Sequence, residues 1–526
     1  MLSRILGLVR DQLLAAFMGA GALQDAYQVA FRLPNMFRRL FGEGAFNAAF
    51  VPLFSSVLTK EGAPEARNFA RRALGVMLVW LVFLCVLGEV FMPQVLRIIA
   101  PGFMQHGDRY TLGVSLSRIT FPYLVLICAA ALVAGVLNGL HKFSMAAAAY
   151  LAFNVVGIAA IVFAAPFMPN VAYAAAWGVT ASGVVQLGLL LWACHRAGFG
   201  LMPLPPRLTP RIKLLVRRMV PGLIGSGVGQ INLTIDTIIA TLLPSGSVSL
   251  MYFADRINQL PLGVLGAAAG TTLLPVLTRH LAAGDHVAAR DAQNRSIDYV
   301  LLLTLPAVAG LMVLAGPIMI VLFGHGAFTE HDALLSAQAL RAYALGLPAF
   351  VMVKVLSPAF FARGDTRTPV YIGIGILVFN FGLNLALMKP LLHVGPPLAS
   401  SIAAFFNVAC LAVILHRRKA LELEGQTKRR IGLTIVASGI MGGVVWLLGQ
   451  GFVFPHNFWA RSVWLGSMVM AGAGVYAVLL HMLGLADLAR IFARLRRKLS
   501  REEIGGCNGG GYSGARSRYG NLSAGC

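Results

Sequence analysis

The chain has 526 residues, of which 58% are hydrophobic and 12% charged, with a formal net charge of +23 and a mean hydropathy of +0.76. Soluble domains carry about twice this charged fraction, so the composition excludes a soluble globular protein and indicates an integral membrane protein. In such a protein an excess of Lys and Arg marks the cytoplasmic loops, and no nucleic-acid partner is needed to explain it.

Apolar stretches of the length that a spanning helix needs, about 20 residues, recur along the whole chain. We therefore expect an all-α polytopic protein with about fourteen transmembrane helices. The segments lie near residues 1–20, 25–58, 73–98, 111–139, 143–167, 171–194, 213–243, 247–280, 297–323, 334–362, 369–388, 394–416, 431–453 and 459–483. The second and eighth contain internal prolines, among them Pro34 and Pro261, which predicts bent helices there.

The loops differ in charge. Loops after even-numbered segments carry most of the Lys and Arg, whereas loops after odd-numbered segments carry almost none apart from Arg109, Lys389 and Arg461. The basic run from Arg490 to Lys498 follows the last segment. By the positive-inside rule, both termini are expected in the cytoplasm.

A weak internal repeat relates the two halves of the chain. Asp11 precedes Asp236 by 225 residues, and Tyr27 precedes Tyr252 by the same offset. Six helices per unit is an even number, so the halves share one orientation, as in a parallel repeat. We expect the following organisation: a six-helix lobe over residues 1–200, a second over 201–420, helices 13 and 14 over 421–485, and a basic cytoplasmic segment with a disordered Gly/Ser-rich tail over 486–526.

Ionisable side chains inside a bilayer are costly and usually face a polar cavity or one another. Several lie within the predicted helices, and the excess of Arg over acidic residues predicts an anionic ligand, because guanidinium binds phosphate oxygens in a bidentate manner. Salt bridges between helices are the alternative, and a cation exporter would need uncompensated carboxylates. Spacing does not choose between Arg38 and Arg39, because Pro34 resets the helix phase. The candidate substrate-binding residues are Arg4, Arg10, Asp25, Arg38, Arg39, Asp255, Arg256 and Lys354.

A second group combines a carboxylate with amides. Asp236 lies in the middle of a predicted helix, and Asn380 and Asn384 are one turn apart on another. Such hard ligands serve Na⁺ in transporters, although hydrogen bonds between packed helices are the alternative. We expect no other cofactor and no enzymatic activity, because the chain contains neither a P-loop nor a D-x-D or D-D pair for Mg²⁺.

Several blocks of sequence resemble one known family. They are S-R-I-L-G-L-V-R-D at 3–11, the block at 19–52 that contains F-R-L-P-N-M-F-R-R-L-F-G-E-G, G-S-V-S-L-M-Y-F-A-D-R at 246–256, L-P-L-G-V-L-G at 260–266 and V-K-V-L-S-P at 353–358. Over residues 3–485 the chain is similar to the MurJ (MviN) family of lipid II flippases, in the multidrug/oligosaccharidyl-lipid/polysaccharide exporter superfamily.

The resemblance implies two lobes around a V-shaped central cavity in the bacterial cytoplasmic (inner) membrane. It implies transport of lipid II, the undecaprenyl-pyrophosphate-linked peptidoglycan precursor, from the inner to the outer leaflet by alternating access. Membrane lipids and the cell-wall synthesis machinery would be further partners. Helices 13 and 14 would form a groove for the lipid tail, and some family members have a sodium site at positions similar to Asp236, Asn380 and Asn384. The family's cavity residues correspond to Arg4, Arg10, Arg38, Arg256 and the acidic Asp25.

One departure concerns position 259, which is Gln where some members have Glu, so that an acidic partner for Arg256 would be missing. Three alternatives stay open: a flippase for another polyprenyl-linked oligosaccharide, a multidrug exporter of the same fold, and a membrane-embedded transferase or phosphatase acting on the same lipid.

Overall fold

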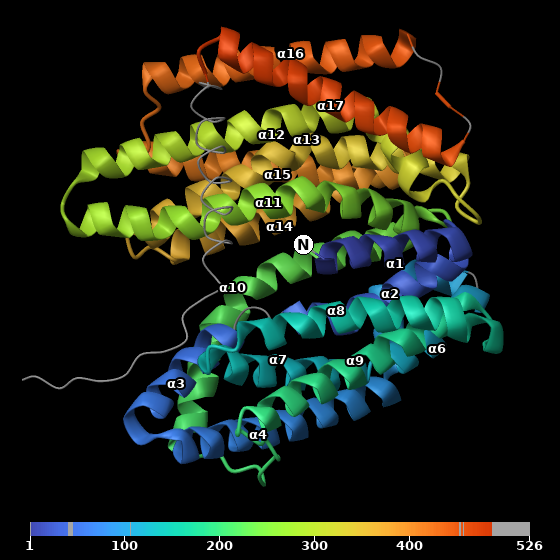
Figure 1. Ribbon diagram of the computed structural model, residues 1–526, viewed down its shortest axis with the longest axis vertical. Coiled ribbons are helices and arrows are strands. Elements are labelled where there is room, and N and C mark those ends of the chain that lie inside the picture. Colours follow the sequence, from blue (N-terminus) through green and yellow to red (C-terminus); the bar gives the residue numbers. More distant parts are fainter. Residues whose placement is uncertain (1, 40–45, 106, 452–453, 456, 486–526) are drawn as a thin grey trace, which may run out of the picture.

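The computed structural model describes residues 2–39, 46–105, 107–451, 454–455 and 457–485. The predicted basic segment and tail over 486–526 lie outside this part of the chain. Across the described residues the chain forms helices and no strand (Figure 1). This confirms the all-α fold, which suits a bilayer because a helix satisfies its own backbone hydrogen bonds.

Each of the fourteen predicted segments contains at least one helix. The helices of the first half are α1 (Leu2–Met18), α2 (Ala22–Phe37), α3 (Phe46–Glu61), α4 (Ala63–Val90), α5 (Met92–Ile99), α6 (Gly107–Thr120), α7 (Tyr123–Gly139), α8 (Phe143–Ala159) and α9 (Val171–Arg196). Those of the second half are α10 (Pro210–Thr241), α11 (Ser247–Ala282), α12 (His286–Phe323), α13 (Glu330–Phe361), α14 (Arg367–Leu391), α15 (Gly395–Arg417), α16 (Gly425–Gly451) and α17 (Phe458–Met482). Short 3-10 or π turns are η2 (Pro101–Gln105), η3 (Ala160–Ala164), η4 (Ala165–Phe167) and η5 (Leu392–Val394).

Within the described residues, nine stretches are long and apolar enough to cross a membrane, judged by length and composition. One of them covers 51 residues and contains both α14 and α15. The helices α1, α2 and α11, which carry most of the charges predicted to line a cavity, are not among the nine. The chain is thus a multi-pass membrane protein in which the most polar helices are the ones expected at its centre.

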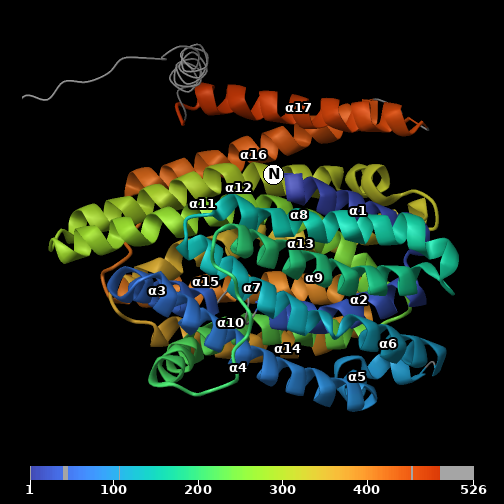
Figure 2. The same ribbon diagram turned by 60° about the horizontal axis from the view of Figure 1, so that its bottom comes forward.

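The helices form two lobes, which Figure 1 shows one above the other. We call α1–α9 the N-lobe and α11–α15 the C-lobe. Helix α10 runs between them and contacts both α3 and α14. The pair α16 and α17 lies on the far side of the C-lobe against α12 (Figures 1 and 2).

Each lobe has its own aromatic core. In the N-lobe, Phe50 stacks between Phe46 and Phe54 and also against Phe69, with ring centroids 5.1–5.7 Å apart. In the C-lobe, Phe253 packs against Phe323 and Phe328. Offset and edge-on ring contacts of this kind add to the free energy of burial, so each lobe is held together by its own side chains.

Three predicted segments are divided. The segment near 73–98 covers parts of α4 and α5. The segment near 25–58 consists of α2 and α3, and the segment near 111–139 is broken between α6 and α7 at Phe121 and Pro122. Proline ends the hydrogen-bond ladder because it lacks an N–H group. Helix α11, in contrast, continues as one helix through Pro261 and Pro275.

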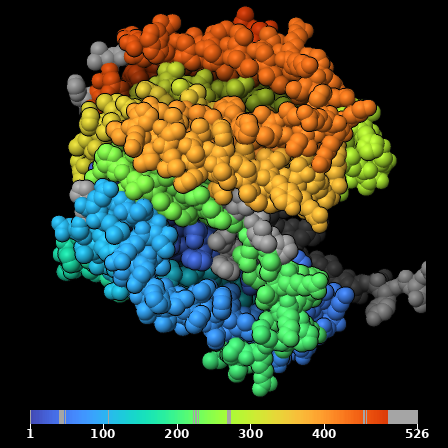
Figure 3. All heavy atoms as spheres, turned by 180° about the vertical axis from the view of Figure 1, so that it is seen from behind, coloured from blue at the N-terminus to red at the C-terminus, as the bar shows by residue number. Residues whose placement is uncertain are grey.

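At one end of the molecule the turn between α12 and α13 lies against the end of α1. The backbone N–H of Ala327 donates to the carbonyl of Ala16 at 2.8 Å. Gly326 has a φ of +65°, and a Cβ atom there would lie 2.4 Å from the Ala16 oxygen, so only glycine fits this approach. Seen from behind, the two lobes leave a hollow between them in which blue N-terminal atoms are visible (Figure 3).

Candidate functional site

A cavity of about 890 Å³ lies between the lobes. Its lining comes from α1, α2, α7, α8, α9, α10, α11, α13 and α15, together with Arg38 and Arg39 after α2. Among the described residues, seven cationic side chains and two carboxylates line it: Arg4, Arg10, Arg32, Arg38, Arg39, Arg256, Lys354, Asp236 and Asp255. The structure therefore brings together seven of the eight predicted substrate-binding residues, and it adds Arg32.

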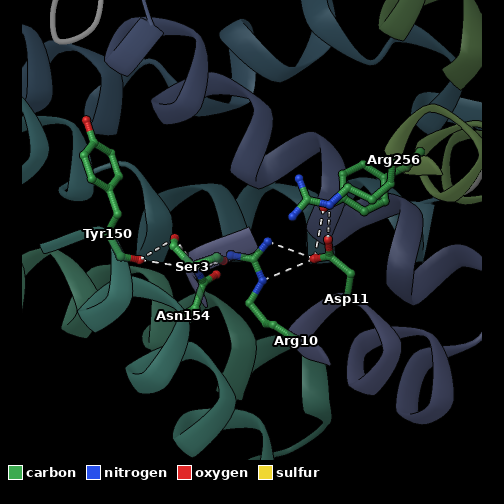
Figure 4. A network of polar contacts seen from close by, with 7 residues as sticks. Ser3, Arg10, Asp11, Tyr150, Asn154 and Arg256 are labelled. Atoms are coloured by element: carbon green, nitrogen blue, oxygen red, sulfur yellow. Dashed lines mark hydrogen bonds and ion pairs between the residues drawn. The ribbon is translucent and has the colours of Figure 1, made fainter. Parts of the chain in front are cut away.

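The centre of this lining is an ion-pair network that joins the lobes (Figure 4). Arg10 of α1 pairs with its neighbour Asp11 at 2.8 Å, and Arg256 of α11 pairs with the other oxygen of Asp11 at 2.7 Å. Tyr252 donates to the same carboxylate at 3.3 Å. The Asp11 side chain is fully buried, which is tolerable for a charge only when it is paired. The expectation that Arg256 lacks an acidic partner is wrong, because Asp11 of the other lobe takes that place.

Neutral side chains fix the position of Arg10. Its guanidinium lies over the ring of Phe153, 5.1 Å from the ring centroid. One residue further along α8, the amide of Asn154 donates to the backbone oxygen of Ser3 at 3.0 Å and ties α1 to α8. Phe153 and Asn154 are not among the predicted site residues, because nothing in their local sequence distinguishes them from ordinary core residues.

The two consecutive arginines after α2 both face the cavity. The ambiguity between Arg38 and Arg39 is therefore resolved in favour of both. Arg38 donates through Nε to the side-chain oxygen of Asn35 at 3.0 Å. Gln259 donates to Asp255 at 3.2 Å, so the glutamine holds a cavity carboxylate in place.

Asp25 lies elsewhere, at the end of the molecule where the lobes meet. Its buried carboxylate accepts from the backbone N–H of Gly246 at 2.7 Å and of Ser249 at 2.9 Å, and it pairs with Arg109 of α6 at 2.9 Å. Asp25 is not part of the cavity lining, and the structure places it as a junction between the lobes. Arg109, an exception in the loop-charge pattern, is its buried counter-ion. A second exception, Arg461, pairs with Glu330 at 2.7 Å.

The predicted hard-ligand group also assembles. Asn380 and Asn384 donate to Oδ1 of Asp236 at 3.1 and 3.0 Å, and Ser400 donates to Oδ2 at 3.2 Å. Asn380 also donates to the side-chain oxygen of Asn232 at 2.8 Å. The side-chain oxygens of Asn380 and Asn384 are buried and accept no hydrogen bond from the described part of the chain.

Such unsatisfied buried oxygens call for a donor or a cation. Turning the two amides would present their oxygens beside the carboxylate, a ligand set that suits a hard monovalent cation. The residues therefore fit Na⁺, and Asn232 and Ser400 extend the predicted set.

The chain is similar to known proteins over most of its length. A family model described as "Lipid II flippase MurJ" matches residues 14–465. A "Probable lipid II flippase MurJ" of Rhizobium tropici is 39% identical over 94% of each chain. The "Lipid II flippase MurJ" of Burkholderia cenocepacia is 35% identical over 84% of this chain and 87% of its own.

Solved structures share the fold. One described as lipid II flippase MurJ in an inward closed conformation matches with a TM-score of 0.77 and 24% identity, covering 91% of this chain and 96% of that one. An inward-facing multidrug resistance MATE family transporter matches with a TM-score of 0.68 and 15% identity, over 79% of this chain and 95% of its own. These two likenesses concern the arrangement of the helices.

Proposed function

The chain belongs to the MurJ family of lipid II flippases, and we propose that its central cavity carries the pyrophosphate of lipid II across the cytoplasmic membrane by alternating access. The observation that carries the proposal is the lining of that cavity, where the described residues contribute seven cationic side chains and two carboxylates. A diphosphate linked to a polyprenyl chain complements such a lining, since Arg forms charge-assisted, bidentate bonds with phosphate oxygens.

Binding would begin when the pyrophosphate competes with the Asp11 carboxylate for two arginines. Arg10 and Arg256 both pair with Asp11 in the structure. A pyrophosphate offers them more oxygens and more negative charge than one carboxylate does. As Arg256 turns toward the phosphate, the ion pair that joins α1 to α11 weakens, and the lobes gain freedom to rock about the remaining contacts.

The charges of the loops indicate how the protein is oriented in the membrane and therefore the direction of transport. Basic residues such as Arg67 and Arg71 lie at the start of α4, where they donate to backbone oxygens of the loop between α9 and α10. By the positive-inside rule this end faces the cytoplasm. The junction formed by Asp25 and the α12–α13 turn then faces the outside, so that the cavity loads from the inner leaflet and unloads when the junction opens.

The lipid tail is too apolar to follow the pyrophosphate into a cationic cavity. Helices α16 and α17 lie outside the C-lobe and expose large apolar side chains, among them Leu447, Val463 and Met470. We assign the tail to the surface between these two helices, where its burial costs no desolvation of charge.

The alternatives make different demands on the cavity. An exporter of cationic drugs would need carboxylates in excess, whereas cationic side chains outnumber carboxylates among the described lining residues. A flippase for another polyprenyl-linked oligosaccharide would share the pyrophosphate chemistry and differ only in the sugar. A membrane-embedded transferase or phosphatase acting on the same lipid would alter it chemically.

A leaflet-resolved assay separates these possibilities. Cells depleted of their own flippase and supplied with this chain are treated with an external enzyme that cleaves lipid II only in the outer leaflet. Our proposal predicts that cleavable lipid II returns with the chain and that its chemical structure is unchanged. Accumulation of intact lipid II on the inner leaflet despite normal protein levels would contradict it, and a chemically altered lipid would favour the enzyme.

A further inference from the structure

Arg32 connects the cationic cavity with the Asp236 group. It lies on α2 of the N-lobe, and its Nη2 donates to the backbone oxygen of Leu233 on α10 at 2.7 Å. Leu233 precedes Asp236 by three residues, about one helical turn. One turn further along α2, Met36 accepts a hydrogen bond from Thr234 at 3.2 Å, so the two helices lie alongside each other at this level.

The guanidinium of Arg32 is poorly matched in its present position. Its acceptor is a neutral carbonyl that already accepts from the hydroxyl of Thr237 at 2.9 Å. Within the described part of the chain, no carboxylate lies within ion-pair distance of Arg32. The charges of Asp236 and Asp255 nevertheless lie within its electrostatic range. Arg32 is therefore a partly buried cation, and most of its five N–H groups can still donate to a ligand.

Among the described residues, the hydrogen-bond donors to Asp236 are neutral: two Asn amides and the hydroxyl of Ser400. A cation held by this carboxylate and the amide oxygens would feel the nearby charge of Arg32 as repulsion, because interactions between partly buried charges are weakly screened. Both Asp236 and Arg32 line the same cavity as Arg10 and Arg256, so an anion bound there lies within reach of Arg32.

We propose that Arg32 makes the binding of an anion in the cavity and of a monovalent cation at Asp236, Asn380 and Asn384 mutually favourable. From its position on the Leu233 carbonyl, the charge of Arg32 opposes the cation. A pyrophosphate draws the guanidinium toward its oxygens and neutralises it, which lowers that repulsion. Linkage is reciprocal, so the cation must raise the affinity for pyrophosphate by the same factor. The proposal rests on the proposed function, since it assumes that the cavity takes a diphosphate.

Binding measurements on the purified full chain in lipid nanodiscs test this directly. Inorganic pyrophosphate is titrated calorimetrically in NaCl and in choline chloride at equal ionic strength. We expect Na⁺ to tighten pyrophosphate binding about tenfold, a typical size for such coupling. Simple screening by salt acts equally in both buffers, so it cannot produce this difference.

Variants assign the effect to residues. Arg32→Gln should abolish the difference between NaCl and choline chloride, and it should raise the affinity for ²²Na⁺ in the absence of pyrophosphate. Arg32→Lys keeps the charge and should keep the sign of the coupling. Arg118→Gln is the matched control, because it removes an exposed arginine of α6 that does not line the cavity, and it should leave the coupling intact.

The outcomes separate the two proposals. If wild-type protein binds pyrophosphate equally in both salts, or if Arg32→Gln keeps the sodium dependence, the linkage through Arg32 is wrong while the anion cavity stands. If wild-type protein binds no pyrophosphate in either salt, the cavity assignment fails and the linkage with it. The wild-type comparison alone decides against the linkage even if Arg32→Gln does not fold.

Discussion

Asp25 of α2 accepts hydrogen bonds from both the backbone N–H and the hydroxyl of Ser249 on α11, at 2.9 and 2.5 Å, so that one residue of the C-lobe holds a buried carboxylate of the N-lobe. The carboxylate has no exposed surface. Opening this end of the molecule must therefore separate a charge from donors that stabilise it. The same pair can hold the lobes closed while substrate loads and must part when substrate leaves.

Replacing Asp25 should weaken the contact between the two lobes at the junction where Asp25 binds Ser249. Hydrogen bonds to a charged group contribute about 1.5–3 kcal/mol each, and Asp25→Asn removes the charge and places an amide N–H₂ near donors. The test uses Ala327→Cys in a background without native cysteines. Its thiol should react faster with a membrane-impermeant reagent when Asp25→Asn is also present than when Asp25 is intact. Ser249→Ala removes one donor and should have a smaller effect in the same direction. Equal labelling rates in all three proteins would mean that Asp25 does not hold the lobes together.

The close approach of Gly326 to Ala16 gives a steric test of the same junction. In Gly326→Ala, a Cβ atom would lie 2.4 Å from a backbone oxygen at a φ of +65°; such backbone strain alone costs about 1–3 kcal/mol. We expect a shift toward the open junction and impaired complementation of a flippase-depleted strain. Gly382→Ala is the control, since nothing lies within 4 Å of its Cβ position. Normal growth and unchanged thiol labelling with Gly326→Ala would show that the junction tolerates the extra atom.

The cavity arginines should be required for function. Arg38→Ala and Arg256→Ala are expected to abolish complementation while protein levels stay normal, because each removes a bidentate donor for phosphate. The Lys variants should be partly defective, since ammonium keeps the charge but loses the planar fork. Arg118→Ala, outside the cavity lining, should grow normally. Full growth of both Ala variants at the two cavity positions would rule out the anion cavity.

Transport should depend on membrane potential. Moving one elementary charge across the membrane is worth about 2.3 kcal/mol per 100 mV, so a negative interior expels the polyanion and draws the empty cationic site back. Collapsing the potential should stop lipid II from reaching the outer leaflet even when ATP is present. Asp236→Asn should weaken any sodium dependence and leave lipid binding intact. Undiminished flipping without either gradient would contradict both ideas and indicate passive transport.

The segment after residue 504 should be dispensable. It is rich in Gly and Ser and has no apolar face to bury. Truncation after Ile504 is expected to leave membrane insertion and complementation unchanged, as measured by protein level in the membrane fraction and by growth. A truncated chain that inserts normally but fails to support growth would reveal a role for this segment.

Hydropathy and charge along the chain determined which stretches become helices, because insertion into a bilayer depends mainly on the local length of apolar sequence. They also indicated that the arginines of the first two segments face a cavity, since charge within a membrane is costly anywhere else. The ligand class followed from the excess of Arg over acid. These properties belong to single helices and can be read from neighbouring residues.

The partners of the charges were decided by the tertiary structure. Asp25 was expected in the cavity, and it binds Arg109, Gly246 and Ser249 at the junction instead. Asp11 bridges Arg10 and Arg256, which lie 246 residues apart. Spacing within one helix gives the face on which a side chain lies, but the partner depends on how two lobes approach each other. That approach is fixed by contacts between residues far apart in the chain, such as Ala16 with Ala327 and Arg32 with Leu233.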